Sequence, residues 1–328
     1  MAEQRDVVAE VGLLIYPDCQ LSAVYGLTDL FRIASQWVPY QADHQRSVRV
    51  SHWQVAQDDV VCVWDSHPGS AHRLSYIIAP PSIIMPAKMQ AMPVAARWMI
   101  AQHDKGATIG SICAGAFVLA ETGLVDGRRV TTHWAFSDEL AARYPKLELA
   151  AERMVIDDGD ILTAGGILAW TDLGLTLVEK LMGVQTMLAT ARFLLVDPPR
   201  RDQDVYRSFV PKFDHGDAAI LHVQHHIHAK ASEAHDISDF ADRAGLTERT
   251  FLRRFVKATG LRPTEYLQQI RMMQARDALE TTGLPVAQIS WNVGYSDVTA
   301  FRRIFLRVTG LTPMQYRQRF GVRSNLAS

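Results

Sequence analysis

The clearest candidate for chemistry in the first half of the sequence is Cys113. It stands among small residues in Ser111–Gly115 (SICAG), after an apolar run and before a helical one. A tight strand-to-helix turn of this kind is typical of nucleophile elbows, in which one side chain projects above the end of a sheet. The helix N-terminus is expected to lower the pKa of the thiol. Twenty residues later His133 offers a proton partner, so the pattern indicates thiol chemistry or a binding pocket.

A second pattern with chemical meaning is a basic repeat within residues 237–319. A Gly-Leu-x-Pro-x-x-Tyr block begins at Gly260 and again at Gly310, 50 residues further on. Such repeats usually mark copies of one supersecondary unit. In each copy a short apolar helix is predicted to end at a glycine, Gly245 or Gly294. Glycine there permits a sharp turn with left-handed backbone.

Another helix is predicted after the turn in each copy. Its start is a hydroxyl residue, Thr247 or Ser296, of the kind that caps helices. Apolar and basic residues alternate along it, so one face should be buried and the other exposed. The exposed faces are predicted to carry Arg249, Arg253 and Arg254 in the first copy and Thr299, Arg302, Arg303 and Arg307 in the second. Two matched copies favour helix-turn-helix units that enter the DNA major groove over a merely solvated helix face.

These residues resemble the AraC-type transcription regulators over roughly residues 217–320. The most recognisable run is Ala287–Asp297 (AQISWNVGYSD). The resemblance implies two helix-turn-helix units joined by a long helix, here expected from Pro263 to about Thr281. It also implies base-reading roles, which fall on Arg249, Thr250, Arg253, Val298, Thr299, Arg302 and Arg303. Among them, Val298 can make only apolar contacts, for example with a thymine methyl group, and the same holds for Leu252 in the first copy.

Hydrophobic patterning in the first 200 residues predicts strands that alternate with helices. Strands are expected at 7–15, 48–55, 60–63, 76–79, 107–112, 130–132, 154–156 and 161–163, and helices at 21–34, 94–103, 114–122, 167–181 and 185–195. This alternation argues for an α/β sandwich with a largely parallel sheet. We therefore expect one domain over residues 1–200, a linker over 201–216, an all-α DNA-binding domain over 217–320 and a tail over 321–328.

The run from Cys113 to Trp134 resembles the ThiJ/PfpI superfamily, relatives of class I glutamine amidotransferases, and the sensor domains fused to AraC-type modules. The resemblance implies a flavodoxin-like sandwich, dimerisation through this domain, and a ligand pocket at Cys113, Ala114, His133 and Trp134. Two departures weigh against turnover. Ala23 stands where the family often has an acid, and Pro81 stands where it usually has a glycine whose N–H faces the pocket. We therefore expect no catalytic residues.

The charge is unevenly distributed along the chain. Residues 217–328 hold 15 Lys+Arg and 10 Asp+Glu, a net charge of +5, whereas residues 1–216 hold 19 and 25, a net charge of −6. A basic C-terminal part suits nucleic acid. Three irregularly spaced cysteines argue against a disulfide framework or structural zinc. With neither a signal peptide nor a membrane span in the pattern, we expect a cytoplasmic protein that has no membrane partner.

The leading hypothesis is a sequence-specific regulator that binds a double-stranded DNA operator as a homodimer and responds to a small-molecule effector. By resemblance the effector would be a small nitrogen-containing metabolite, such as a quaternary amine or amino acid, with Trp134 and Trp170 as possible aromatic contacts. The alternative is a cysteine-dependent hydrolase or amidase with a DNA-binding tail. A third hypothesis is a sensor that signals by oxidation of Cys113. No cofactor is expected, and the histidines His222 and His226 are predicted to lie on the wet side of a helix rather than to bind metal.

Overall fold

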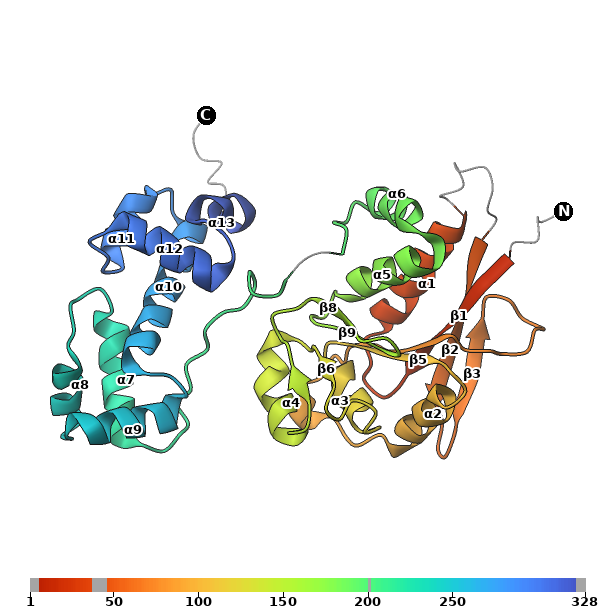
Figure 1. Ribbon diagram of the computed structural model, residues 1–328, viewed down its shortest axis with the longest axis horizontal. Helices are drawn as coiled ribbons and strands as arrows, with labels where there is room; N and C mark the ends of the chain where they lie inside the picture. The colour runs from red at the N-terminus through yellow and green to blue at the C-terminus, as the bar shows by residue number, and fades with distance from the viewer. Residues whose placement is uncertain (1–5, 37–45, 200–201, 323–328) are drawn as a thin grey trace. The chain divides into compact units, whose positions relative to one another are not determined.

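The computed structural model describes residues 6–36, 46–199 and 202–322. It divides the chain into two compact units, Met1–Gln203 and Asp204–Ser328 (Figure 1). The first unit has one hydrophobic core, and the second has two smaller ones. Within the described ranges, no helix has both the length and the apolar character needed to cross a lipid bilayer.

A seven-stranded sheet organises the first unit. In spatial order its strands are β3 (Val60–Asp65), β2 (Arg46–Val55), β1 (Asp6–Ile15), β4 (Tyr76–Ala79), β5 (Thr108–Ile112), β9 (Ile161–Ala164) and β8 (Val155–Asp157). The strands from β2 to β9 are parallel, and β3 and β8 pair antiparallel at the edges. Val11, Ile77 and Ile109 on the central strands are fully buried, as expected when both faces of a parallel sheet are covered. The predicted α/β class is confirmed.

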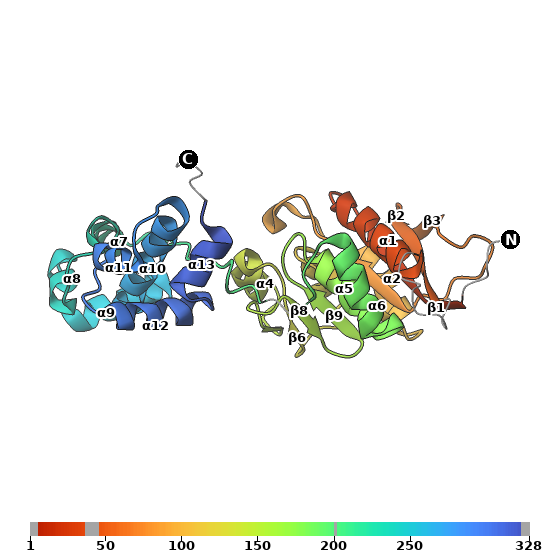
Figure 2. The ribbon, with the colours of Figure 1, turned by 90° about the horizontal axis from the view of Figure 1, so that it is seen from above.

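Helices cover both faces of this sheet. On one face α1 (Leu21–Gln36), α5 (Trp170–Met182) and α6 (Val184–Leu194) lie side by side (Figure 2). On the other face lie α2 (Pro93–His103), preceded by a 3-10 turn (Pro86–Lys88), and α3 (Gly115–Ala120). Gly174 lies where α5 packs on α1, because a Cβ atom there would lie 2.9 Å from a terminal carbon of Leu27 on α1.

The segment between α3 and β8 differs from the prediction. The strand expected over 130–132 is only β6 (Arg129–Val130), which pairs with β7 (Glu148–Leu149) outside the main sheet. A 3-10 turn (Trp134–Phe136) and α4 (Ser137–Arg143), neither of which was predicted, follow it. The hydroxyls of Thr131 and Thr132 donate to the carbonyls of Arg153 and Cys113, each over 2.8 Å. Side-chain hydrogen bonds, rather than strand pairing, therefore hold this stretch.

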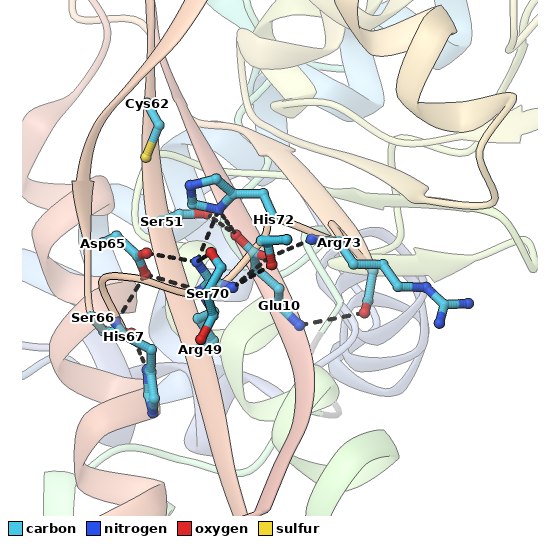
Figure 3. A network of polar contacts seen from close by, with 12 residues as sticks. Glu10, Arg49, Ser51, Cys62, Asp65, Ser66, His67, Ser70, His72 and Arg73 are labelled. Atoms are coloured by element: carbon cyan, nitrogen blue, oxygen red, sulfur yellow. Dashed lines mark hydrogen bonds and ion pairs between the residues drawn. The ribbon is translucent and has the colours of Figure 1, made fainter.

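A buried ionic network fastens the connection between β3 and β4 to the sheet (Figure 3). Arg49 on β2 donates to both carboxylate oxygens of Asp65, over 3.0 and 2.6 Å, and this pairing holds the pKa of Asp65 below its ordinary range. Glu10 on β1 accepts from Ser51 over 2.8 Å and lies 2.6 Å from Nδ1 of His72. Every charged member is thus satisfied inside the network, which gives it a structural role.

In the described residues of the second unit, all regular secondary structure is helical. Its helices are α7 (Ala218–Lys230), α8 (Ile237–Arg243), α9 (Glu248–Thr259), α10 (Pro263–Thr281), α11 (Val286–Asn292), α12 (Val298–Thr309) and α13 (Pro313–Phe320). Phe251, Phe255 and Tyr266 belong to one core, and Phe301, Phe305 and Tyr316 take the matching places in the other. α10 contributes to both cores and lies between the two groups of helices (Figure 1). It spans the residues predicted for the joining helix.

Candidate nucleic-acid interface and sensor site

Each predicted helix-turn-helix is present, formed by α8 and α9 in the first copy and by α11 and α12 in the second. The turns depend on Gly245 (φ 65°) and Gly294 (φ 89°), both in the left-handed region. A Cβ atom on Gly294 would also lie 2.6 Å from the carbonyl oxygen of Ser232. The predicted cap Ser296 is wrong by one residue. The carboxylate of Asp297 caps α12, accepting from the backbone N–H of Thr299 over 2.8 Å.

The second helices of the two copies present equivalent faces. Phe251 and Phe255 on α9, like Phe301 and Phe305 on α12, are fully buried, because their four-residue spacing places them on one side of a helix. The opposite sides expose Arg249, Leu252, Arg253 and Val256 on α9, and Thr299, Arg302, Arg303 and Leu306 on α12. We call these two exposed sides the recognition faces. Each combines arginine with aliphatic side chains.

The structure sorts the predicted basic residues into two groups. In the described part of the chain, Arg249, Arg253, Arg302 and Arg303 make no hydrogen bond or ion pair with protein. Arg254 was predicted to be exposed with them, but its guanidinium donates to Asp217 over 2.8 and 2.6 Å. Asp217 caps α7, so Arg254 joins α9 to the start of α7.

Three other predicted residues differ in their surroundings. Arg307 donates to the side chain of Gln268 on α10 over 2.9 Å. Thr250 is half-buried, and its hydroxyl accepts from that of Thr247 over 3.0 Å. Val298 is half-buried at the first position of α12. Neither Thr250 nor Val298 therefore projects as fully as the arginines.

One histidine of helix α7, His228, contacts Tyr266 in the core that α7 shares with α9 and α10. Nε2 of His228 lies 3.0 Å from the hydroxyl of Tyr266, and Gln224 donates to the same oxygen over 3.0 Å. No cluster of three or more His, Cys, Asp or Glu side chains suited to a metal ion occurs in the ranges that the structure describes.

In the first unit the strand-to-helix elbow is present at Cys113. Its φ is 55°, a left-handed conformation that is uncommon for a residue with a side chain. Gly115 is required in the next turn, because a Cβ atom there would lie 2.4 Å from the carbonyl oxygen of Ala79. The elbow is thus built by close backbone contact between β4 and α3.

The state of the thiol contradicts the expectation of a lowered pKa. Cys113 is 2% exposed, and burial raises the pKa of its thiol to about 12, against a smaller opposing effect of the Ala114 backbone N–H. Desolvation disfavours the thiolate more than the helix N-terminus favours it. Among the described residues no hydrogen bond joins Cys113 to His133. Nδ1 of His133 instead accepts from the N–H of Ala135 over 3.1 Å, and burial lowers its pKa.

The loop after β4 is anchored through its carbonyls to the segment between β1 and α1. The hydroxyl of Tyr16 donates to the carbonyl of Pro80 over 2.5 Å, and the N–H of Gln20 donates to that of Pro81 over 2.7 Å. Ala23 is fully buried on α1. Trp170, suggested as an aromatic ligand contact, packs against α1, where a Cβ atom on Gly26 would lie 2.6 Å from its ring.

One residue beside this site was missed from the sequence. Gln203 is 2% exposed, and its Nε2 donates to the Thr132 carbonyl over 2.9 Å while its Oε1 accepts from the N–H of Trp134 over 3.1 Å. It lies in the segment predicted to be a linker, where a polar residue gives no signal of burial. We use the name elbow site for Cys113, Ala114, His133 and Trp134, beside which Gln203 is seated.

Comparison with known proteins gives two family matches. A model described as a helix-turn-helix domain matches residues 240–319, and one described as the DJ-1/PfpI family matches residues 80–180. The chain is 29% identical over 226 residues to the HTH-type transcriptional regulator CdhR of Pseudomonas aeruginosa, covering 69% of this chain and 67% of that one. It is 30% identical over 219 residues to the HTH-type transcriptional regulator GlxA of Rhizobium meliloti, covering 66% and 67%.

A shorter similarity links the chain to an enzyme. It is 43% identical over 79 residues to isonitrile hydratase of Pseudomonas putida, which is 24% of this chain and 33% of the enzyme. The similarities to regulators extend over far more of the chain. The chain belongs to the AraC-type helix-turn-helix transcriptional regulators that carry a DJ-1/PfpI domain.

Proposed function

We propose that this DNA-binding regulator is controlled by a small molecule that binds at the elbow site and is not chemically changed there. The observation that carries the proposal is a strand-to-helix elbow at Cys113 whose thiol is buried and has a raised pKa. The strained backbone costs roughly 1–3 kcal/mol, yet the thiol is buried and its pKa lies at about 12. A site that retains this shape without the reactive group suits recognition better than turnover.

DNA reading is assigned to the recognition faces. Arg249, Arg253, Arg302 and Arg303 have their guanidinium groups free for DNA among the described residues, and bidentate arginine is the commonest reader of guanine. Thr250, Val298 and Thr299 are proposed as supporting contacts at the helix starts. The aliphatic residues Leu252, Val256 and Leu306 are exposed beside the arginines, where they would meet thymine methyl groups.

The proposed assembly is a cytoplasmic homodimer formed through the first unit. Exposed apolar side chains on α1 and β3, Leu21 (48%), Tyr25 (56%) and Trp64 (43%), support a protein contact there. Sedimentation of wild type and of Tyr25→Asp tests this directly. We expect a dimer that the substitution weakens, whereas a monomeric wild type would remove dimerisation from the proposal.

The experiment that tests effector control has two stages. Bound sites are first selected from a random DNA pool with the full chain. A panel of quaternary amines and amino acids is then screened by thermal unfolding and by binding to the selected duplex. A ligand at 100 times its Kd should stabilise the first unit by about 2.7 kcal/mol and shift DNA affinity. Trp134→Ala should abolish both responses. Stabilisation that persists in Trp134→Ala would place the ligand elsewhere.

A second function, cysteine-dependent hydrolysis, is favoured by one observation, the positive φ of Cys113 at a strand-to-helix elbow. The buried thiol and the absence of a hydrogen bond to His133 in the described structure oppose it. Amide and isonitrile substrates should be tested with wild type and Cys113→Ser. Turnover by wild type that the substitution removes would replace the sensing proposal with an enzymatic one.

A further inference from the structure

The side chain of Gln203 is seated more firmly than its place at the end of the first unit suggests. Beyond its bonds to Thr132 and Trp134, its Nε2 also donates to the hydroxyl of Thr131 over 3.1 Å and to the carbonyl of Arg153 over 2.8 Å. A Cβ atom on Gly165 would lie 1.9 Å from this Nε2. The seat is therefore shaped for the carboxamide and depends on a glycine that leaves room for it.

This seat shares backbone with the elbow site. The hydroxyl of Thr132 donates to the carbonyl of Cys113 over 2.8 Å, while its own carbonyl accepts from Gln203. The N–H of Trp134, two residues further on, is held by the same carboxamide. A molecule that moves the 132–134 stretch must therefore strengthen or break the bonds to Gln203.

The residues directly after Gln203 are fastened to the second unit. We call residues 204–215 the strap. The hydroxyl of Tyr206 accepts from Arg319 on α13 over 2.6 Å, and the carbonyl of Arg207 accepts from Arg276 on α10. Phe209 packs edge-on against Tyr266 with ring centroids 5.2 Å apart.

Further along, the strap is held by α7, the helix that precedes the first helix-turn-helix copy and shares its core. Gln224 on α7 donates to the carbonyl of Lys212 over 3.0 Å and lies 2.7 Å from Nε2 of His215. The strap thus bonds to α13, which shares the core of the second copy, and to α7, which shares the core of the first. Through these attachments the strap connects the two groups of helices that carry the recognition faces.

We propose that Gln203 is the positioning residue that couples the elbow site to the recognition faces. The inference rests on the proposed function, because it assigns the route by which that site would act. Only Asp204 and Val205 separate Gln203 in its seat from Tyr206, whose hydroxyl bonds to Arg319 on α13. With so short a stretch between two anchors, seating of Gln203 and attachment of the strap are linked. Because linkage is reciprocal, DNA that binds better to one arrangement of the strap must also change how firmly Gln203 is held in its seat.

The experiment measures hydrogen–deuterium exchange of the full chain in the peptide that contains Trp134, whose N–H reports the seat directly. Three variants are compared with wild type: Gln203→Ala, the control Gln57→Ala at an exposed glutamine, and an insertion of about six Gly and Ser residues between Gln203 and Asp204. Each is measured free, with the selected duplex, and with a scrambled duplex of equal length.

We expect Gln203→Ala to speed exchange at Trp134 about tenfold, because the amide loses its acceptor, and Gln57→Ala to leave it unchanged. In wild type the selected duplex should change exchange at Trp134 at least about threefold more than the scrambled one. The insertion variant should match wild type when free and lose the response to DNA. It retains the Gln203 seat, so the test does not depend on the stability of Gln203→Ala.

Two results would overturn the inference: no effect of the selected duplex on Trp134 exchange in wild type, or an insertion variant that responds as wild type does. Neither result depends on an effector. Failure of every metabolite to shift DNA affinity would instead count against the proposed function, and the linkage between DNA and the seat would remain measurable.

Discussion

Replacing Arg253 and Arg303 by alanine probes the recognition faces at equivalent positions of the two copies. Both side chains are exposed, and neither has a protein partner among the described residues. Their removal should therefore leave the fold intact, with a change in unfolding free energy within about 0.5 kcal/mol. Any loss of DNA binding can then be read as loss of contact with DNA.

The expected loss follows from the kind of contact made. A bidentate arginine on guanine contributes about 1–3 kcal/mol of discrimination, so each substitution should weaken binding to the selected duplex by roughly 5- to 150-fold. The two residues lie in different copies with separate cores. Their effects should therefore add within about 0.5 kcal/mol in the double variant.

Fluorescence anisotropy with the selected and a scrambled duplex, over a series of KCl concentrations, separates base reading from phosphate binding. Base reading predicts a large loss on the selected duplex and a small one on the scrambled duplex. An equal loss on both, with the salt slope reduced by about one per arginine, would identify phosphate contacts instead. No loss on either duplex would refute the assignment of these faces to DNA. Arg254→Ala is the matched control, because its guanidinium bonds to Asp217 and should lower stability rather than specificity.

Four further outcomes follow from the geometry. With its pKa near 12, about one Cys113 thiol in ten thousand is ionised at pH 8, so mass spectrometry should find slow iodoacetamide labelling in the native state and fast labelling after unfolding. Because the folded-state pKa lies above the unfolded value of about 8.5, this group should lower stability as pH rises from about 9 toward 12; a constant unfolding free energy over that range would contradict the raised pKa. Gly115→Ala should destabilise the first unit by about 1–3 kcal/mol in denaturant unfolding, because the new Cβ meets the Ala79 carbonyl. The control Gly283→Ala has open space around the new Cβ and should change the unfolding free energy little. Similar effects of the two substitutions would mean that the elbow relaxes. Asp297→Ala should cost about 1 kcal/mol by removing the cap of α12, and Asp297→Asn should restore most of the loss in thermal unfolding.

Local signals predicted much of the fold. The α/β alternation, the joining helix and both helix-turn-helix units follow from features that act over a few residues, namely apolar spacing and glycine at a left-handed turn. The buried pairs Phe251 with Phe255 and Phe301 with Phe305 show this, because their spacing alone places them on one side of a helix. α4 escaped prediction because it has only seven residues and a single buried one, Leu140.

The candidate sites were predicted less completely, because their properties depend on partners distant in sequence. Sequence spacing identified the elbow and the basic faces. It could not distinguish Arg253 from Arg254, since Asp217, which accepts hydrogen bonds from Arg254, lies 37 residues away. It could not place Gln203 either, because the seat is assembled from residues about 50 to 72 positions earlier.

The amino-acid sequence by itself determined the architecture and the DNA-binding class, because secondary structure, turns and family motifs are written in short runs of residues. Tertiary structure alone decided the chemistry of Cys113. The same elbow that exposes a nucleophile in an enzyme here buries a thiol and raises its pKa to about 12, since desolvation depends on every chain segment that surrounds the sulfur. It also decided which arginines remain free for DNA and where the end of the first unit is anchored.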